Sequence, residues 1–287
     1  MTHDPVAAYL NTLAEGSRGT MKGALGTIAA FFGSTIERFE WHKLRYEKVQ
    51  ALRTHLASSY KSRTVNKALA ALRGVMKAAW RLKIMPTDAY HRAADVKVVR
   101  ISEKLAGRML SMAELRALLN YPDDEPHAMR DTSVIALMYA AGLRRFEVAK
   151  IRCCDYERAT GVLTVRGKGK KIREIKIQQS WRKPVENWLE TSGRSGEQAM
   201  FVSGKKETAL GLTTVSKLIE DRRVKAGVAP FTSHDMRRTF ISNLIDSGAD
   251  LVVVKKIVGH ESVNTTAAYD RRGRDAQDAA IEKLEGL

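Results

Sequence analysis

The residues best suited to chemistry lie near the C-terminus, in the stretch SHDMRRTFISNLIDSGADLVVVKKIVGHESVNTTAAYDRR (233–272). His234 and Arg237 are three residues apart, so a helix would place both side chains on one face. Val258-Gly259-His260 is typical of a helix that ends at glycine, which would present His260 at the mouth of a site. Tyr269 follows a Thr-Thr pair that could cap a further helix. Cationic donors and one phenol, without an acidic cluster, indicate chemistry on a phosphodiester without metal ions.

The charge balance indicates a polyanionic partner. The chain has 49 Lys and Arg against 32 Asp and Glu, a net charge of +17. Residues 1–100 hold 17 of the basic and 7 of the acidic residues, so the N-terminal third is the more basic part per residue. Nucleic acid is the commonest polyanion that binds so basic a chain, and we therefore expect DNA or RNA as the partner.

Length and composition set the remaining frame. A chain of 287 residues is long enough for one large domain or two ordinary ones. It has no apolar run of the roughly 18 residues that a membrane span needs, and its N-terminus lacks the features of a secretory signal. The adjacent Cys153 and Cys154 cannot form a Cys-x-x-Cys metal site and suit a reducing compartment. We expect a cytoplasmic protein without a membrane partner.

The first part of the chain is predicted to be helical, with helices after Asp4-Pro5 and over residues 20–32, 46–58 and 62–82. The last has the clearest apolar stripe, from Val65 to Trp80, and Ser62 as its expected N-cap. Its opposite face carries no acid, and because a helix fits the DNA major groove we expect this face to lie on DNA. The predicted DNA-binding residues are Arg63, Asn66, Lys67, Arg73, Lys77 and Arg81.

A linker is predicted between two domains. Met85-Pro86 ends the fourth helix, and from residue 89 to 109 no apolar period is visible while basic residues recur. Ser111 and Glu114 then have the spacing of a capping box, which marks a new helix. The predicted organisation is a helical domain over residues 1–88, a linker over 89–109 and a second domain over 110–287.

The second domain is predicted to be mainly α with a small β-hairpin. A strongly apolar helix over 131–141 is broken by Gly142, and Arg144 begins the next helix, where its guanidinium and the backbone N–H groups can converge on one anion. Residues 161–177 alternate on both sides of a Gly-Lys-Gly-Lys turn, which predicts a hairpin with Lys168 at its tip. A lysine in such a turn is, by itself, more typical of a residue that keeps an edge soluble. Helices over 180–190 and 213–226 and a strand over 200–203 complete the prediction.

These segments together resemble a known family. AGLRRFEVAKI around residues 142–151, RGKGKKI, HDMRRTF (234–240), VGH (258–260) and Tyr269 stand in the order and spacing of the tyrosine recombinases of the phage-integrase family. The chain is most similar to the two-domain type, which includes Xer and mobile-element recombinases. The resemblance implies an all-α, SAM-like core-binding domain and an α+β catalytic domain that form a C-shaped clamp on DNA.

The resemblance also implies a role for each site residue. Two arginines would bind the scissile phosphate and stabilise its transition state, since a forked guanidinium fits the non-bridging oxygens. The tyrosine would attack the phosphorus, form a 3′-phosphotyrosyl bond and release a 5′-hydroxyl, which a lysine would protonate. One histidine would assist proton transfer and the other would hydrogen-bond the phosphate. The implied catalytic residues are Arg144, Lys168, His234, Arg237, His260 and Tyr269, with Glu147 in a structural role.

No cofactor is implied, because the phosphotyrosyl bond retains the energy of the broken phosphodiester. His234 and His260 lack a third ligand at metal-site spacing, which argues against zinc. Arg238 stands where many members of the family have histidine, and we expect little consequence of this difference.

The family's assembly is implied as well. The tail after Tyr269 contains RRGR and the amphipathic DAAIEKLEGL, and in the family such a tail docks on a neighbouring protomer. This implies a homotetramer on two double-stranded DNA sites, with strand exchange through a Holliday junction, for integration, excision or resolution of a mobile element or replicon. We expect no additional arm-binding domain. A type IB topoisomerase and a non-catalytic DNA-binding regulator on the same fold remain as alternatives.

Overall fold

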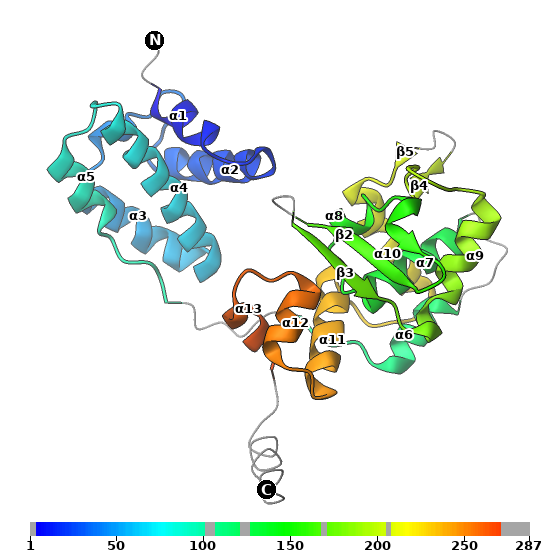
Figure 1. Cartoon of the computed structure of the whole chain (residues 1–287). Coiled ribbons are helices and arrows are strands. Elements are labelled where there is room, and N and C mark those ends of the chain that lie inside the picture. Colours follow the sequence, from blue (N-terminus) through cyan, green and yellow to red (C-terminus); the bar gives the residue numbers. More distant parts are fainter. Residues whose placement is uncertain (1–3, 101–106, 121–126, 168–170, 205–207, 271–287) are drawn as a thin grey trace, which may run out of the picture. The chain divides into compact units, whose positions relative to one another are not determined.

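The computed structural model describes residues 4–100, 107–120, 127–167, 171–204 and 208–270 (Figure 1). The chain divides into two compact units, Met1–Lys104 and Leu105–Leu287, which are treated separately below. In the described ranges, no helix has the length and apolar character that would let it cross a bilayer.

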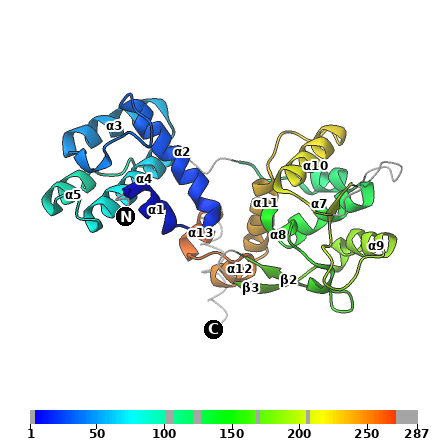
Figure 2. The same ribbon diagram turned by 90° about the horizontal axis from the view of Figure 1, so that it is seen from above.

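The N-terminal unit is helical and is organised around its fourth helix. Asp4 caps the first helix by accepting a 2.8 Å hydrogen bond from the Val6 N–H, as its sequence predicts. The fourth helix packs against the four others and buries the stripe that begins at Val65 (Figures 1 and 2). The helices are α1 (Pro5–Asn11), α2 (Glu15–Phe31), α3 (Tyr46–Ser59), α4 (Ser62–Arg81) and α5 (Thr87–Ala94), with a 3-10 turn at Trp41–Lys43.

The predicted linker begins too early. Residues 87–94 form α5, which packs on α3 and α4 and buries Ala89 and Ala93. The backbone beyond it stays attached to α4, because the Asn66 side-chain amide hydrogen-bonds both the N–H and the carbonyl of Val99 at 2.8 Å. Two buried alanines on an eight-residue helix are too weak a stripe to be recognised in the sequence.

The predicted N-cap at Ser62 is also wrong, since α4 is preceded by Lys61, which makes no side-chain cap bond.

The C-terminal unit has a helical layer with a small sheet on one side (Figures 1 and 2). Helix α7 lies at its centre and packs against α6, α8, α9 and α11. The predicted hairpin is confirmed: β2 and β3 pair antiparallel, with Val165 opposite Arg173, and β1 adds to the β2 edge. The elements up to α10 are α6 (Met112–Leu119), α7 (Ala128–Ala140), α8 (Arg145–Val148), β1 (Tyr156–Glu157), β2 (Val162–Arg166), β3 (Ile172–Lys176), α9 (Lys183–Ser192), β4 (Val202–Ser203), β5 (Thr208–Ala209) and α10 (Leu212–Lys225).

Three helices follow, α11 (Ser233–Asp246), α12 (Leu251–Val258) and α13 (Val263–Ala267). Their buried apolar residues form a small core of their own, which includes Tyr269. Gly259 ends α12 in the left-handed conformation, with φ of 65°, as the sequence predicts. The expected threonine cap of α13 is wrong: Ser262 caps this helix by accepting from the Asn264 N–H, and Thr266 lies inside it, fully buried.

Candidate active site

Arg237 is the most deeply buried member of the candidate site, with 1% of its surface exposed. It projects from α11, and its two terminal nitrogens donate to the carbonyl oxygens of Gly142, at 2.5 Å, and Val258, at 2.6 Å. One side chain thereby joins α11 to the turn before α8 and to the end of α12. Burial, together with the positive charge of Arg144, lowers the pKa of Arg237 to about 9, which still leaves the guanidinium charged at neutral pH.

Arg144 is held by a carboxylate that it shares with a second arginine. The backbone N–H of Arg144 donates to Glu147 Oε2 at 2.8 Å, and its Nη1 donates to Oε1 at 3.0 Å. Arg173, on β3, donates to both oxygens of the same carboxylate at 2.9 Å. Burial opposes ionisation of Glu147, but the hydrogen bonds and charges of Arg173 and Arg144 together outweigh it and hold the pKa of Glu147 below its ordinary value. The carboxylate therefore fixes Arg144, whose side chain remains one-third exposed.

The two histidines flank Tyr269. His234 Nε2 lies 3.1 Å from the Tyr269 hydroxyl, and the His260 ring is stacked on the Tyr269 ring with 5.9 Å between centroids. His260 Nδ1 is 3.0 Å from Thr266 Oγ1, which sets the orientation of this ring. The Tyr269 side chain is thus contacted on its ring and at its hydroxyl.

Both histidines favour the neutral form. Burial lowers the pKa of His260 to about 4, and the positive charges of Arg237 and Arg144 act in the same direction. Burial and then Arg237 also lower the pKa of His234 from its ordinary value of 6.5. A neutral His234 can accept a proton at Nε2, so the pair His234–Tyr269 has the composition of a base and a nucleophile.

Two cavities give a ligand access to these groups. One, of about 250 Å³, is lined by Arg144, His234 and Arg237. The other, of about 720 Å³, is lined by Arg144, Arg173 and His260, and also by Gly167 and Lys171 at the base of the hairpin. The structure thus brings together five of the six predicted residues. The sixth, Lys168, lies outside the described residues, between β2 and β3.

Two residues at the site were not predicted to have a role there. Arg173 was missed although its position carries a signal: residues 173 and 175 face inward from β3, and a cation at an inward position of a strand requires a partner. Arg238 was noted as a departure from the family pattern. It is 2% exposed, and its guanidinium carbon lies 5.3 Å from the centre of the Tyr269 ring.

The predicted DNA-binding face of α4 requires correction at two positions. The side-chain amide of Asn66 is bound to Val99, and the Arg73 guanidinium donates to the carbonyls of Ala94 and Val96. These side chains hold the end of the N-terminal unit together, so we withdraw them from the predicted interface. Four predicted residues are exposed, namely Arg63, Lys67, Lys77 and Arg81.

Helix α1 covers part of this face. Gly74 lies on it between Lys67 and Lys77, and the Tyr9 ring of α1 occupies the space that a side chain at Gly74 would take, since an added Cβ would come within 2.1 Å of the ring. The basic residues therefore form two exposed pairs along α4, one on each side of this contact, instead of one continuous stripe.

Comparison with known proteins places this arrangement in a family. Residues 108–274, more than half of the chain, match the family model described as "Phage integrase family". Tyrosine recombinase XerC of Syntrophus aciditrophicus (strain SB) is 28% identical over 244 residues, which cover 80% of this chain and 76% of that protein. XerC of Vibrio parahaemolyticus is 34% identical over 164 residues, which cover 56% of this chain and 53% of that protein, about half its length.

Solved structures agree on the fold. The Tn1549 transposon integrase in complex with transposon right end DNA has a TM-score of 0.75 at 14% identity, with 98% of this chain and 99% of that chain covered. A lambda integrase dimer bound to a COC′ core site has a TM-score of 0.70 at 16% identity, with 95% and 96% covered. These identities are too low to carry more than the fold, but the family model covers the segment that holds the assembled site. The chain therefore belongs to the phage integrase family, the tyrosine recombinases.

Proposed function

We propose that this protein cleaves and rejoins DNA at specific sites through a covalent bond to Tyr269. The observation that carries the proposal is the arrangement around this phenol: a neutral His234 lies 3.1 Å from its hydroxyl, and the same helix projects the buried, charged Arg237. A site with a nucleophile, a base and fixed guanidinium groups suits attack on a phosphodiester.

We infer the steps of the reaction from these groups and from the family to which the chain belongs. The Tyr269 oxygen attacks the scissile phosphorus while His234 accepts the phenolic proton. Arg144 and Arg237 bind the non-bridging oxygens and stabilise the charge that builds on them in the transition state. The bond from phosphorus to the 5′ oxygen breaks, and we assign Lys168 to protonate the leaving oxygen. The products are a 3′-phosphotyrosyl bond and a free 5′-hydroxyl, and attack by another 5′-hydroxyl reverses the step to rejoin DNA.

We further propose that four protomers pair two DNA sites and exchange strands through a Holliday junction, with each tail docked on a neighbour. The expected tail lies outside the described residues. Integration, excision and resolution all fit this scheme. Two alternatives differ from this scheme. A type IB topoisomerase would cleave and relax DNA without pairing two sites, and a regulator would bind DNA without cleaving it.

Covalent trapping tests the proposal directly. Labelled duplexes would be tiled across the DNA that flanks the gene, each with a nick that lets the short cleaved fragment diffuse away. After denaturation, we expect an adduct between wild-type protein and one duplex, and none with Tyr269→Phe, because phenylalanine lacks the attacking oxygen.

The same duplex separates the alternatives. With two intact sites in one reaction, a recombinase accumulates a four-way junction, whereas a topoisomerase forms adducts without one. Tight binding to a duplex with no adduct under any condition would instead establish a DNA-binding regulator.

Helix α4 supplies a second test. We propose that its exposed basic residues contact DNA phosphates. Lys67→Glu and Lys77→Glu should each weaken binding to the trapped duplex, and each should reduce the salt dependence of log K by about 0.9, the slope for one phosphate contact. Lys183→Glu, a matched charge reversal at an exposed lysine of α9, is the control. Unchanged affinity and slope in both α4 variants would remove this helix from the interface.

Arg173 gives a third prediction. Arg173→Met leaves the fully buried Glu147 carboxylate with Arg144 as its remaining guanidinium partner. We expect the free energy of unfolding to fall by about 3 kcal/mol, at the lower end of the cost of breaking a buried pair, because Arg144 remains. Adduct formation should slow more than DNA binding weakens, since Arg144 loses its orientation.

The control for Arg173 lies on the neighbouring strand. Arg166→Met removes an arginine of β2 that shares the buried Asp155 carboxylate with Arg152. Its effect should be smaller than that of Arg173→Met, because the Arg166 side chain is nearly half exposed and solvent screens its charge. Equal unfolding free energies and equal cleavage rates for the two variants would contradict the role of Arg173.

The protonation state of His260 gives a fourth prediction. In an NMR titration of the free protein with labelled histidine, His260 should titrate near 4, whereas an exposed histidine titrates near 6.5. The unfolded chain takes up this proton first as pH falls, so the free energy of unfolding should decrease below pH 6.5. Bound DNA should raise the pKa, because a phosphate brings negative charge. Titration near 6.5 in the free protein would show that this ring is not desolvated.

A further inference from the structure

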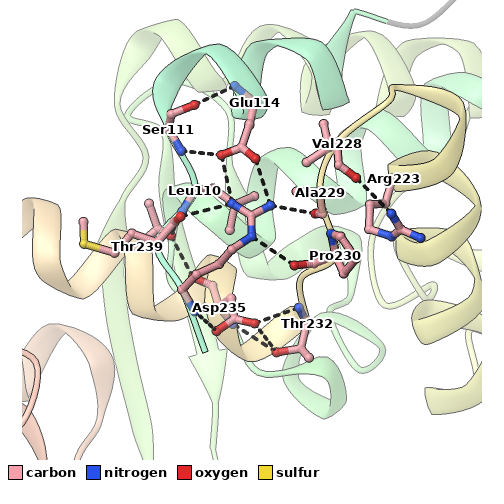
Figure 3. A network of polar contacts seen from close by, with 12 residues as sticks. Leu110, Ser111, Glu114, Arg223, Val228, Ala229, Pro230, Thr232, Asp235 and Thr239 are labelled. Atoms are coloured by element: carbon pink, nitrogen blue, oxygen red, sulfur yellow. Dashed lines mark hydrogen bonds and ion pairs between the residues drawn. The ribbon is translucent and has the colours of Figure 1, made fainter. Parts of the chain in front are cut away.

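A polar network fastens the start of the C-terminal unit to helix α11 (Figure 3). The backbone N–H of Arg108 donates to Asp235 Oδ1 at 3.1 Å, and that of Leu110 donates to Thr239 Oγ1 at 2.9 Å. The Arg108 side chain continues the contact by donating to the carbonyl of Pro230 at 2.9 Å and to Glu114 at 3.0 Å. The incoming chain is therefore attached to the helix that carries His234 and Arg237.

Asp235 is the centre of this network. It is 4% exposed, and its Oδ2 accepts from both the N–H and the hydroxyl of Thr232 at 2.8 Å. Thr232 is the N-cap of α11, and it forms a capping box with Asp235. Its Oδ1 accepts from Arg108 and also lies 3.6 Å from Nε of Arg238, one turn along the helix. The buried carboxylate thus binds the incoming chain on one side and Arg238 on the other.

Arg238 extends the network to the nucleophile. Its guanidinium carbon is 5.3 Å from the centroid of the Tyr269 ring, a distance at which a cation is attracted to an aromatic face. His234 contacts the hydroxyl of the same tyrosine, and the Ser242 hydroxyl lies 3.4 Å from its carbonyl oxygen. Residues of α11 therefore contact the ring, the hydroxyl and the backbone of Tyr269.

Gly107 shows how closely the incoming chain fits this arrangement. Its φ is +108°, and a Cβ added there would lie 2.1 Å from Asp235 Oδ1 and 3.2 Å from Arg238 Nε. The absence of a side chain at residue 107 allows the chain to reach Asp235 while Asp235 remains beside Arg238.

We propose that Arg238 is a positioning residue that holds Tyr269 for attack, and that Asp235 makes its placement depend on the docking of Gly107 and Arg108. The inference rests on the proposed function, because it requires Tyr269 to be the nucleophile. It assigns a role to the position where the sequence departs from the common family pattern, for which little consequence was expected.

The test is the single-turnover rate of adduct formation at saturating nicked duplex, measured beside the dissociation constant for the same duplex. Arg238→Gln should slow adduct formation on the order of 10²-fold, the effect of a small misplacement of a reacting group, and leave the dissociation constant nearly unchanged. The rate of adduct formation by Arg238→Lys should lie between those of Arg238→Gln and wild type, because lysine retains the positive charge but lacks the planar guanidinium. Arg222→Lys, a change to a buried arginine of α10 that donates to the Leu118 and Ala128 carbonyls, should react at the wild-type rate.

A modified substrate distinguishes positioning from proton donation. In a duplex whose bridging 5′ oxygen is replaced by sulfur, the leaving thiolate needs no proton. Lys168→Ala should therefore cleave this duplex at the wild-type rate. Arg238→Gln should remain slow on this substrate, because the tyrosine is still misplaced. A wild-type rate of Arg238→Gln on this substrate would overturn the proposal. A larger dissociation constant with an unchanged rate of adduct formation would also overturn it.

Gly107→Ala tests the link to the incoming chain while the Arg238 side chain is retained, because the added Cβ clashes first with Asp235 Oδ1, at 2.1 Å, and lies 3.2 Å from Arg238 Nε. It should slow adduct formation, whereas Gly227→Ala, at a glycine with φ of +63° and no neighbour within 4 Å of its added Cβ, should not. Equal rates for the two variants would overturn the role of Asp235 docking. If wild-type protein forms no adduct, the proposed function itself fails. If wild-type protein forms the adduct and the Arg238 and Gly107 variants react at the same rate, the proposed function stands and only the positioning role fails.

Discussion

The site depends on the burial of one charged group, the guanidinium of Arg237. A cation with 1% exposure is costly unless it is hydrogen-bonded, and here the carbonyls of Gly142 and Val258 accept from its two terminal nitrogens, while its Nε has no hydrogen-bond partner among the described residues. Those carbonyls are available because α7 stops before Gly142 and α12 stops at Val258. Each helix end thus leaves a backbone oxygen without a helical partner, and the arginine binds both. The same two helix ends set the positions of Arg144 and His260.

Charge is distributed around this centre in a consistent way. Two guanidinium groups share the Glu147 carboxylate, so the cluster of Arg144, Glu147 and Arg173 retains a net positive charge beside Arg237. That excess disfavours protonation of His260 and His234, and it matches the negative charge of a phosphodiester. Burial is the main cause of the lowered pKa of both histidines, and the positive charge that would attract an anion acts in the same direction.

Local signals predicted much of this structure. The glycine after α12, the start of α8 at Arg144 and the β2–β3 hairpin are each determined by a few adjacent residues, and the structure confirms them. The sequence was less informative where a side chain bonds distant backbone. Asn66 reaches Val99, 33 residues away, and no pattern within α4 distinguishes it from a solvent-facing polar residue. The inward position of Arg173 on β3 was a signal, but its partner Glu147 and the contact of Arg238 with Tyr269 are tertiary contacts that no local pattern identifies.

Tyr269 belongs to the small apolar core of Ile241, Ile245, Val254 and Val258, not to the main core beneath the sheet. Phe240 and Ile257 pack against both clusters, so within the described residues they join two bodies of very different size. Few apolar residues form this small body, so we expect it to open locally at a lower free energy than global unfolding. Its opening would release the phenol from His234 while Arg144 and Glu147, on the larger body, keep their pairing. Arg237 would be disturbed in the same event, because it donates to the Val258 carbonyl of the small body. The fold thus makes the nucleophile and one phosphate-binding arginine depend on the same few apolar contacts, and both can be displaced without unfolding the protein.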